Sequence, residues 1–567
     1  MRLYAHYFIW LLTAWPGQVA SSPLAAAQWD EFHGFPPYGY QCAANHGHPL
    51  QPPNGQWQGW GADSSNNRWA SAGAGVNSAN AASLAQTCSM QYAHGVSATA
   101  TVLGNIAYYP TWSGLYVALN YITCTPVWQI NVTTLALNFG PVESAVFTFL
   151  GSRTSAAIDG NVLYFGTLAH ALVVAVDLHT GTIIDQIQIN DHPFALITQS
   201  PTVWQGILYI GVASAEESVA AYIPGYKCCS FVGNFDAITL RAGKLSILWT
   251  QYMVPPGTGW SGVAVWGSQP SIDPGRGQVF IGTGNVYNLP QEFSDCQAQT
   301  ANVTVIQQGL GPDPCTPRNV YVESVLALDL RTGFVNWALH VGPLDAFSVA
   351  CIGLVSVNPA GCPEHPGPDA DFGMAPTFVP GSASTPHGQD TLVLGQKNGN
   401  LYAISAQAGT IFWALQAGPG GVSGGLMWGL AVDDSTIYYT ATNSEAKTWQ
   451  LQPSGTTIKN SAFGAASLAT GKILWQTQAP NNSLSYGDPS IVNDVILTGW
   501  TAQGSIFAGT AGLGGLVALQ KTSGAIIKDY PLNNQFYANI AIANGYVLFG
   551  TGYRGLPGNG SFNVWKA

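Results

Sequence analysis

The sequence predicts an all-β protein, an eight-bladed β-propeller of four-stranded antiparallel blades. A phrase made of an apolar strand, a tight turn and Thr-Gly-x-x-x-Trp or a close variant recurs at 324–337, 400–413 and 463–475. Such a repeat is typical of small sheets that cannot bury both faces alone and therefore stack against their neighbours. The 66 Gly and 35 Pro, with only 8% charged residues, suit many tight turns and few exposed helices.

Eight candidate blades follow one another along the chain. They are 98–128, 156–181 with Asp185 in the usual Trp place, 200–249, 270–337 around an insertion at 289–319, two blades ending at Trp413 and Trp475, 488–531, and a short last blade made of AIANGYVLFGTGY and FNVWKA. Alternating runs such as V-L-Y-F indicate strands, and no long helix is expected. We expect the segment around 57–69 to supply the missing strand of the last blade, which would close the ring and remove an open edge.

The first residues predict an export signal. Arg2 precedes the apolar stretch 7–14, and small residues follow, so a signal peptide is assigned to 1–22, with cleavage between 20 and 27, and an uncleaved anchor as the alternative. An N-terminal extension at 23–56 and the propeller at 57–567 complete the domains. No later run of about 20 apolar residues is present, so no membrane span is expected after cleavage. Sequons at Asn131, Asn302, Asn481 and Asn559 fit a glycoprotein that is secreted or in the secretory pathway.

The cysteines also suggest an oxidising compartment. Cys296 with Cys315, and Cys351 with Cys362, would each close a loop, whereas the adjacent Cys228 and Cys229 can pair with each other or elsewhere. Nine cysteines leave at least one free or paired between chains. No C-x-x-C-H motif for a covalent haem occurs, and a formal charge of −11 argues against nucleic acid as a partner.

Five passages of the sequence, which occur in the same order as in a known family, carry a resemblance to it. They are SRTSAAIDGNVLYFGT, SAEE followed by CCSFVGNFDAIT, VWGSQPSIDPGRGQVFIGTGN, GPDADFG and VLGQKNGNLYAI. Over about 57–553 the chain resembles the pyrroloquinoline-quinone repeat propellers of quinoprotein alcohol dehydrogenases, more narrowly the polyvinyl-alcohol-dehydrogenase-like branch. The resemblance implies an oxidoreductase acting on CH–OH donors with pyrroloquinoline quinone and Ca²⁺. Because the haem motif is lacking, a separate electron acceptor would be needed.

The resemblance also implies two ligands for the cation. Ca²⁺ prefers oxygen ligands, and by motif Glu216 of SAEE and Asn285 of GTGN occupy the family's positions. The alternative for Glu216 is a solvated loop carboxylate, a role for which Glu217 is the more natural candidate. The alternative for Asn285 is a turn residue after Gly284.

Three further residues match the family's chemistry. Asp371 corresponds to the general base, with Asp369 as its local competitor. Lys397 corresponds to the cation beside the quinone oxygens, and Trp266 to the indole beneath the cofactor ring. The alternative for Trp266 is a propeller core residue, since the chain has 19 Trp.

Two departures from the family pattern affect the cofactor site. In the polyvinyl-alcohol-type branch an Arg commonly follows the Cys-Cys-x-Phe phrase, whereas here Val232 follows Phe231. Arg153 could supply the replacement charge, or could make a loop salt bridge. The adjacent cysteines also come after the Glu motif, so they are not assigned to the cofactor roof.

Three functions follow from these observations. The first is a quinoprotein oxidoreductase acting on a small-molecule alcohol. The second is an oxidoreductase that tailors a small phenolic or polyketide-like metabolite without bound quinone. The third is a binding scaffold that presents propeller loops to a protein or glycan. Glu216, Asn285, Asp371 and Lys397 together favour the first two, whereas the missing Arg and the low charge favour the second or third. The residues do not specify the substrate.

Overall fold

The computed structural model describes residues 51–143, 146–300, 313–353, 355–502, 513–554 and 559–567. The proposed signal peptide at 1–22, most of the extension at 23–56, Cys42 and the sequon at Asn302 lie outside these residues. In the described part of the chain, no helix is long and apolar enough to cross a membrane. The other three sequon asparagines, Asn131, Asn481 and Asn559, are exposed.

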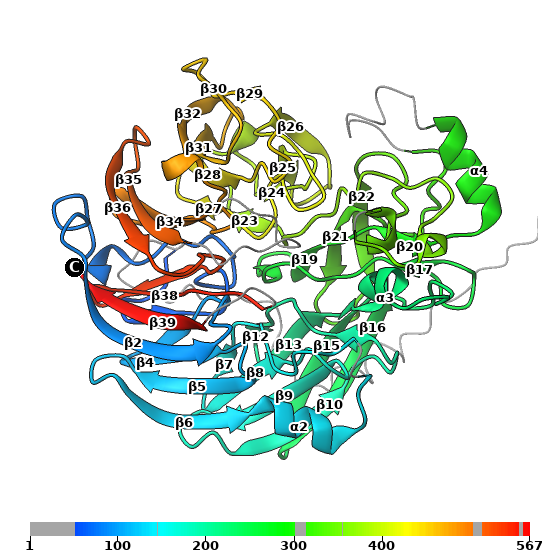
Figure 1. Ribbon diagram of the computed structural model, residues 1–567, viewed down its shortest axis with the longest axis horizontal. Helices are drawn as coiled ribbons and strands as arrows, with labels where there is room; N and C mark the ends of the chain where they lie inside the picture. The colour runs from blue at the N-terminus through cyan, green and yellow to red at the C-terminus, as the bar shows by residue number, and fades with distance from the viewer. Residues whose placement is uncertain (1–50, 144–145, 301–312, 354, 503–512, 555–558) are drawn as a thin grey trace, which may run out of the picture. The chain divides into compact units, whose positions relative to one another are not determined.

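Eight antiparallel blades of four strands each are arranged around one axis, which confirms the predicted propeller (Figure 1), and β1 (Gln56–Trp57) adds a fifth strand to the sheet of blade one. Blade one consists of β3 (Thr101–Leu103), β4 (Ile106–Pro110), β5 (Leu115–Asn120) and β6 (Thr125–Asn131), and blade two of β7 (Ala157–Asp159), β8 (Val162–Gly166), β9 (Leu172–Asp177) and β10 (Ile183–Gln188). Blade three consists of β12 (Thr202–Trp204), β13 (Ile207–Gly211), β15 (Asn234–Arg241) and β16 (Lys244–Tyr252), and blade four of β18 (Ser271–Asp273), β19 (Gln278–Gly282), β21 (Ser324–Asp329) and β22 (Val335–His340).

Blade five consists of β23 (Thr377–Val379), β24 (Thr391–Gly395), β25 (Asn400–Ser405) and β26 (Ile411–Gln416), and blade six of β27 (Ala431–Val432), β28 (Thr436–Ala441), β31 (Ala462–Ser467) and β32 (Ile473–Gln478). Blade seven consists of β33 (Ser490–Val492), β34 (Val495–Thr501), β35 (Gly514–Gln520) and β36 (Ile526–Leu532), and blade eight of β37 (Ile540–Ala543), β38 (Tyr546–Gly550), β39 (Asn559–Lys566) and β2 (Ala85–Ala93). The first strand of each blade lies nearest the axis, and the inner strands are buried whereas the fourth strands are partly exposed. The helices of the described residues are short: α2 (Val132–Phe139), α3 (Glu216–Tyr222) and α4 (Gln291–Thr300).

The Gly and Trp of the sequence repeat are the two halves of a joint between successive blades. Five indoles lie over five glycines of the next blade, each with φ between 67° and 71°: Trp128 on Gly181, Trp249 on Gly333, Trp337 on Gly409, Trp413 on Gly471 and Trp475 on Gly524. A Cβ at any of these glycines would lie 2.3–2.8 Å from the indole, so no side chain fits there. Each indole Nε1 also donates to a backbone carbonyl of the next blade. The Gly and Trp of the repeat therefore serve to pack each blade against the next one.

The joint between blades two and three uses charge instead of an indole. Asp185 occupies the Trp place, and it accepts hydrogen bonds from Leu245 N at 2.8 Å and Lys244 Nζ at 3.0 Å. Gly243, at the position where an indole would pack, has only Ile184 at 4.0 Å from a notional Cβ. The joint between blades two and three is thus less tightly packed than the five joints that contain an indole.

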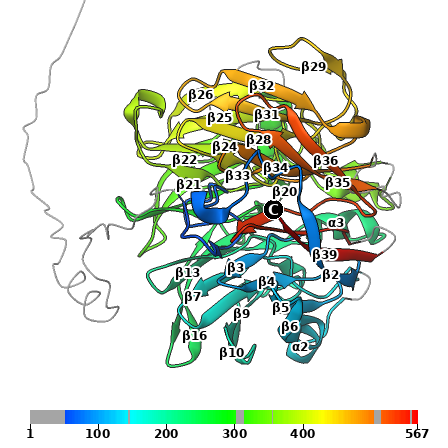
Figure 2. The same ribbon diagram turned by 90° about the vertical axis from the view of Figure 1, so that its left-hand side faces the viewer.

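The strand that completes the last blade is β2, so the expectation that 57–69 supplies it is wrong. β2 pairs antiparallel with β39 and lies beside it in Figures 1 and 2. The disulfide Cys88–Cys124 joins β2 to the β5–β6 turn of blade one. Because β2 carries no Gly-x-x-x-Trp phrase and its partner lies at the far end of the chain, the local pattern did not reveal it.

Residues 58–70, here called the axial segment, run along the inner strands instead. β1 (Gln56–Trp57) first adds to the inner edge of β3. Backbone N–H groups of Ile272, Phe378, Val432 and Ile491 then donate to carbonyls of the axial segment, which links it to blades four to seven. These bonds satisfy inner-strand edges that would otherwise be buried without partners.

Arg68 anchors the axial segment. Its guanidinium is fully buried and donates to the carbonyls of Pro489 at 2.9 Å and Trp60 at 2.6 Å and to Ser490 Oγ at 2.8 Å. Burial lowers its pKa to about 10, while the nearby Asp488 acts in the opposite direction. The guanidinium is thus bound mainly to neutral oxygens contributed by different parts of the ring.

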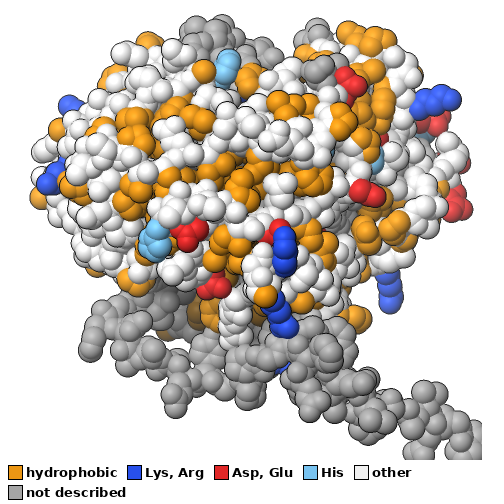
Figure 3. All heavy atoms as spheres, turned by 90° about the horizontal axis from the view of Figure 1, so that it is seen from below, with side chains coloured by type: hydrophobic (Ala, Val, Ile, Leu, Met, Phe, Trp, Pro, Cys, Tyr) orange, Lys and Arg blue, Asp and Glu red, His pale blue; other side chains and the backbone are white. Residues whose placement is uncertain are grey.

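Disulfides and surface agree with the composition. Cys296–Cys315 and Cys351–Cys362 form as expected, and Cys228 pairs with Cys229. Figure 3 shows one face of the molecule, on which the few charged side chains are scattered among polar and hydrophobic ones. No basic stripe appears on this face, in keeping with the low charge content.

Candidate functional site

A cavity of about 600 Å³ is formed mainly by the loops that lead into the inner strands and by α3. Five of the six predicted site residues line it: Arg153, Trp266, Asn285, Asp371 and Lys397. They come from blades two, four and five, so residues up to 244 positions apart meet at one place. The remaining wall is largely aliphatic and aromatic, as in most small-molecule sites.

Asp371 and Lys397 form the polar centre of the cavity. Lys397 Nζ lies 3.0 Å from Asp371 Oδ2 and 2.8 Å from Asp369 Oδ1, and the lysine side chain is 9% exposed. Burial opposes the charged lysine, but the two carboxylates outweigh it and raise the pKa of Lys397 above its usual value. The ammonium group therefore stays charged and holds both aspartates.

Two further donors orient the Asp371 carboxylate. Asn285 N donates to Oδ1 at 2.7 Å, and Trp266 Nε1 donates to Oδ2 at 3.2 Å. Gly284 makes this approach possible, because a Cβ there would lie 2.9 Å from Oδ1. Oδ1 accepts one hydrogen bond, from Asn285 N, whereas Oδ2 accepts two, from Trp266 Nε1 and Lys397 Nζ. Oδ1 is therefore the oxygen that is more available to a substrate hydroxyl.

Trp266 belongs to the cavity wall. Its ring lies 5.4 Å from Lys397 Nζ and 5.5 Å from the ring of Trp428, with the two indole planes at 84°. The indole is only partly buried. The indole therefore lines the cavity and is not a fully buried core side chain.

Asn285 presents its side-chain oxygen as the atom left for a ligand. Both hydrogens of the amide nitrogen are used, by the carbonyls of Val286 at 3.0 Å and Phe347 at 2.7 Å. The residue is 2% exposed, and it lies between the Asp371 contact and the cavity. The amide orientation is thus set by the backbone.

The structure places Glu217, and not Glu216, in the cavity. Glu216 is fully buried, and its carboxylate accepts from Tyr226 Oη at 2.7 Å, Ser230 N at 2.9 Å and Phe231 N at 2.8 Å. Because successive helical residues project about 100° apart, the next glutamate on α3 points elsewhere and lines the cavity. Glu216 instead holds the CCSF loop.

Glu217 sits in an unfavourable electrostatic environment for a carboxylate. Burial raises its pKa to about 7, Lys397 offsets part of this effect, and Asp371 and Asp345 add to it. Three carboxylates, Glu217, Asp369 and Asp371, thus share one lysine at this wall.

A second layer of carboxylates, missed by the sequence analysis, supports the site. Asp345 is fully buried, and its Oδ2 accepts from Ala370 N at 2.8 Å, which fixes the turn between Asp369 and Asp371. Behind it lies Glu323, whose pKa is raised by burial and by Asp345. Neither residue belongs to a recognisable motif, so only the folded arrangement reveals them.

Two arginines contribute positive charge to the cavity. The Arg153 guanidinium lies 5.0 Å from the Trp428 ring centroid, and that of Arg554 lies 5.8 Å from Trp112. Among the described residues, neither forms an ion pair with a carboxylate, so the loop salt bridge considered for Arg153 is not observed. Arg554 follows Tyr553 in the last blade and had no sequence signal.

Two other expectations concern cysteine and metal. Cys228 and Cys229 pack near Ala220, Ala221 and Val349 rather than lining the cavity. In the part of the chain that the structure describes, no group of three or more His, Cys, Asp or Glu side chains is assembled as a metal site. Lys397 holds the two aspartates instead.

Comparison with known proteins confirms the resemblance. A repeat-family model described as outer membrane protein assembly factor BamB matches residues 322–555. The chain is 27% identical to a polyvinylalcohol dehydrogenase of Sphingopyxis sp. (strain 113P3), over 88% of this chain and 70% of that protein. It is 28% identical to a polyvinylalcohol dehydrogenase of Pseudomonas sp, over 68% of this chain and 54% of that protein.

Solved structures support the same fold. A quinohemoprotein alcohol dehydrogenase from Comamonas testosteroni matches with a TM-score of 0.60 at 16% identity, over 90% of this chain and 80% of that one. A europium-containing methanol dehydrogenase matches with a TM-score of 0.60 at 15% identity, over 90% and 98%. The chain is therefore similar in sequence to alcohol dehydrogenases of the quinone-repeat type, as predicted, and it shares the fold of their propellers.

Proposed function

We propose that this quinone-repeat propeller is an oxidoreductase that oxidises the hydroxyl group of a small-molecule alcohol, with pyrroloquinoline quinone and Ca²⁺ as cofactors. The observation that carries the proposal is the Lys397–Asp371–Trp266 cluster inside a cavity of about 600 Å³. A carboxylate that is held by a lysine and an indole and lines a cavity is a candidate base for the proton of a substrate hydroxyl.

The cavity suits a planar anionic quinone. Trp266 offers an indole for stacking, and Lys397, Arg153 and Arg554 supply positive charge near it. Arg153 and Arg554 compensate for the arginine that is missing at Val232. When bound, the quinone supplies an acceptor for two electrons.

Calcium would be held at the wall where carboxylates are in excess. Asn285 offers its side-chain oxygen, and Glu217 offers its carboxylate. A divalent cation would offset the burial and the repulsion by Asp371 and Asp345 that together raise the Glu217 pKa. We therefore propose Glu217, in place of Glu216, as the carboxylate ligand on α3.

The chain's own residues then account for proton removal. Asp371 Oδ1 takes the proton of the substrate hydroxyl, while Lys397 and Trp266 hold Oδ2 in place. Asn285 N orients Oδ1, and Asp345 secures the turn that carries the base. The apolar wall, which includes Phe347 and Met427 among others, limits access of water.

Export and electron transfer complete the proposal. Four disulfides among the described residues suit an oxidising compartment, so we propose that the protein is secreted or enters the secretory pathway. Since the sequence has no C-x-x-C-H motif, a separate acceptor would receive the electrons. No described residue selects a polyketide-like substrate over another alcohol.

Reconstitution tests the proposal directly. The mature protein is mixed with the quinone and CaCl₂, or LaCl₃ in a parallel arm, and bound chromophore and alcohol-dependent dye reduction are measured. We expect a stoichiometric chromophore and turnover with at least one simple alcohol. Absence of quinone binding at micromolar concentration with either metal would reject the proposal.

A further inference from the structure

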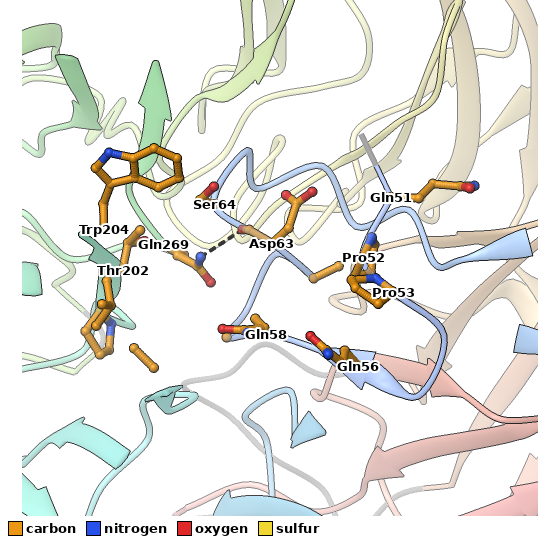
Figure 4. A pocket seen from close by; sticks show the side chains of 15 residues that line it. Gln51, Pro52, Pro53, Gln56, Gln58, Asp63, Ser64, Thr202, Trp204 and Gln269 are labelled. Carbon is orange, nitrogen blue, oxygen red and sulfur yellow. Dashed lines mark hydrogen bonds between the residues drawn. The ribbon is translucent and has the colours of Figure 1, made fainter. Parts of the chain in front are cut away.

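A second pocket, of about 280 Å³, lies between the axial segment and the inner strands of blades two and three. The axial segment bonds to the inner strands of blades four to seven but not to β7 or β12, and the space left beside these two strands is the pocket (Figure 4). We call it the axial pocket.

The axial pocket is polar on one side and aromatic on the other. Figure 4 shows Trp204 on one side and Asp63, Gln58 and Gln56 across from it. Gln269 is fixed, because its Oε1 accepts from Gly61 N at 3.1 Å and its Nε2 donates to Asp63 O at 3.0 Å. No lysine or arginine is among the described residues that line the pocket.

Several polar groups in the pocket remain available to a ligand. The half-buried side chains of Gln56 and Gln58 make no hydrogen bond to any other described residue. Asp63, whose Oδ1 accepts from Ser65 N at 2.8 Å, is also among the residues that line the pocket. The wall thus combines amides that both donate and accept with one carboxyl acceptor.

We propose that the axial pocket binds a neutral polyhydroxylated molecule, a sugar or polyol of about one ring. Primary amides pair with neighbouring hydroxyls through one donor and one acceptor, and a carboxylate accepts from two hydroxyls. The Trp204 indole offers a flat apolar surface for the C–H face of such a ring. An anionic sugar is disfavoured, because burial already raises the pKa of Asp63 to about 7 and no lysine or arginine among the described lining residues would balance a second anion beside it.

The axial pocket is separate from the cavity that holds Asp371. Buried serines of three blades lie between them: Ser155 N donates to Ser200 Oγ at 2.9 Å, and Ser200 N donates to Ser268 O at 2.8 Å. The two sites share no lining residue. The proposal is therefore independent of the oxidoreductase function.

Binding of D-glucose to the full mature protein, without quinone or added metal, tests the proposal. Saturation-transfer NMR and calorimetry are run on the wild type and on the variants Trp204→Ala, Gln58→Ala and Gln91→Ala. We expect glucose to bind, D-glucuronate to bind at least tenfold more weakly, and Trp204→Ala and Gln58→Ala each to lower glucose affinity about tenfold. Gln91, an exposed glutamine on β2, is the matched control and its variant keeps wild-type affinity.

The variants keep the test decisive. Gln58 makes no side-chain hydrogen bond within the described chain, so its truncation preserves the fold even if Trp204→Ala does not. A wild type that gives no saturable glucose signal overturns the proposal. Glucose binding that survives in both pocket variants places the sugar elsewhere and also overturns the proposal.

Discussion

Arg68 and Lys397 are both buried basic side chains near the propeller axis, but their surroundings differ. Arg68 is fully buried and donates to backbone carbonyls and a serine hydroxyl from distant parts of the ring. Lys397 is 9% exposed, contacts two carboxylates and faces the cavity beside an indole.

The difference separates structure from chemistry. A guanidinium saturated by neutral acceptors fixes the positions of the segments that supply them, and it leaves no group for a ligand. The Lys397 ammonium, by contrast, pairs with two carboxylates beside a cavity. Such an arrangement contributes little to folding stability and is typical of a site that binds or transfers charged groups. We therefore expect substitutions around Lys397 to affect turnover and substitutions around Arg68 to affect folding.

The largest effect is expected for the base. Asp371→Asn should lower turnover of the quinone-loaded protein by about 10²–10⁴-fold, because the amide cannot take the hydroxyl proton. Its melting temperature and bound quinone should stay near wild type. Asp369→Asn is the matched control, and a greater loss of turnover in that variant would reassign the base to Asp369.

Arg68→Met tests the structural cluster. Removal of the guanidinium leaves buried carbonyls without a hydrogen-bond donor and leaves Asp488 without its nearby cation. The free energy of unfolding should therefore fall by about 3–5 kcal/mol. Urea titration followed by tryptophan fluorescence measures this loss. Protein that remains folded should turn over at the wild-type rate, and a selective loss of turnover would contradict the comparison.

The sequence predicted the parts of the fold that depend on neighbours along the chain. Gly409 and Trp413, for example, lie in one short phrase, although each contributes to a different joint. The position of β2 depends instead on pairing with β39 more than 400 residues away, and no local pattern encodes that contact. The axial segment escaped prediction for the same reason.

The candidate site was predicted to a similar extent. Asp371, Lys397, Trp266 and Asn285 stand in passages that resemble a family, and the structure brings them together. Glu216 and Glu217 are adjacent, so only the helix phase of α3 separates them. Asp345 and Arg554 lie in unremarkable sequence, and their roles arise from long-range packing.

The glutamate pair offers a smaller and more specific effect. Glu217→Gln should raise the Ca²⁺ concentration needed for half-maximal reconstitution about tenfold and leave the melting temperature unchanged. Glu216→Gln should lower the free energy of unfolding by about 1–3 kcal/mol, because it disturbs the bonds to Ser230 and Phe231. The reverse pattern would restore Glu216 as the ligand.

The smallest effect per measured step is the pH dependence of the Arg68 cluster. Burial raises the pKa of Asp488 from 3.8 to about 7, and Arg68 offsets only part of that rise. Between these two values the unfolded chain loses this proton and the folded chain keeps it, so the stability that Asp488 contributes falls as pH rises from about 4 to 7. Asp488→Asn should therefore flatten the curve of unfolding free energy against pH in this window, by at most about 1.4 kcal/mol per pH unit. Urea titrations of both proteins at four pH values between 4.5 and 7.5 measure the slope, and parallel curves would show that Asp488 is ionised in the folded protein throughout.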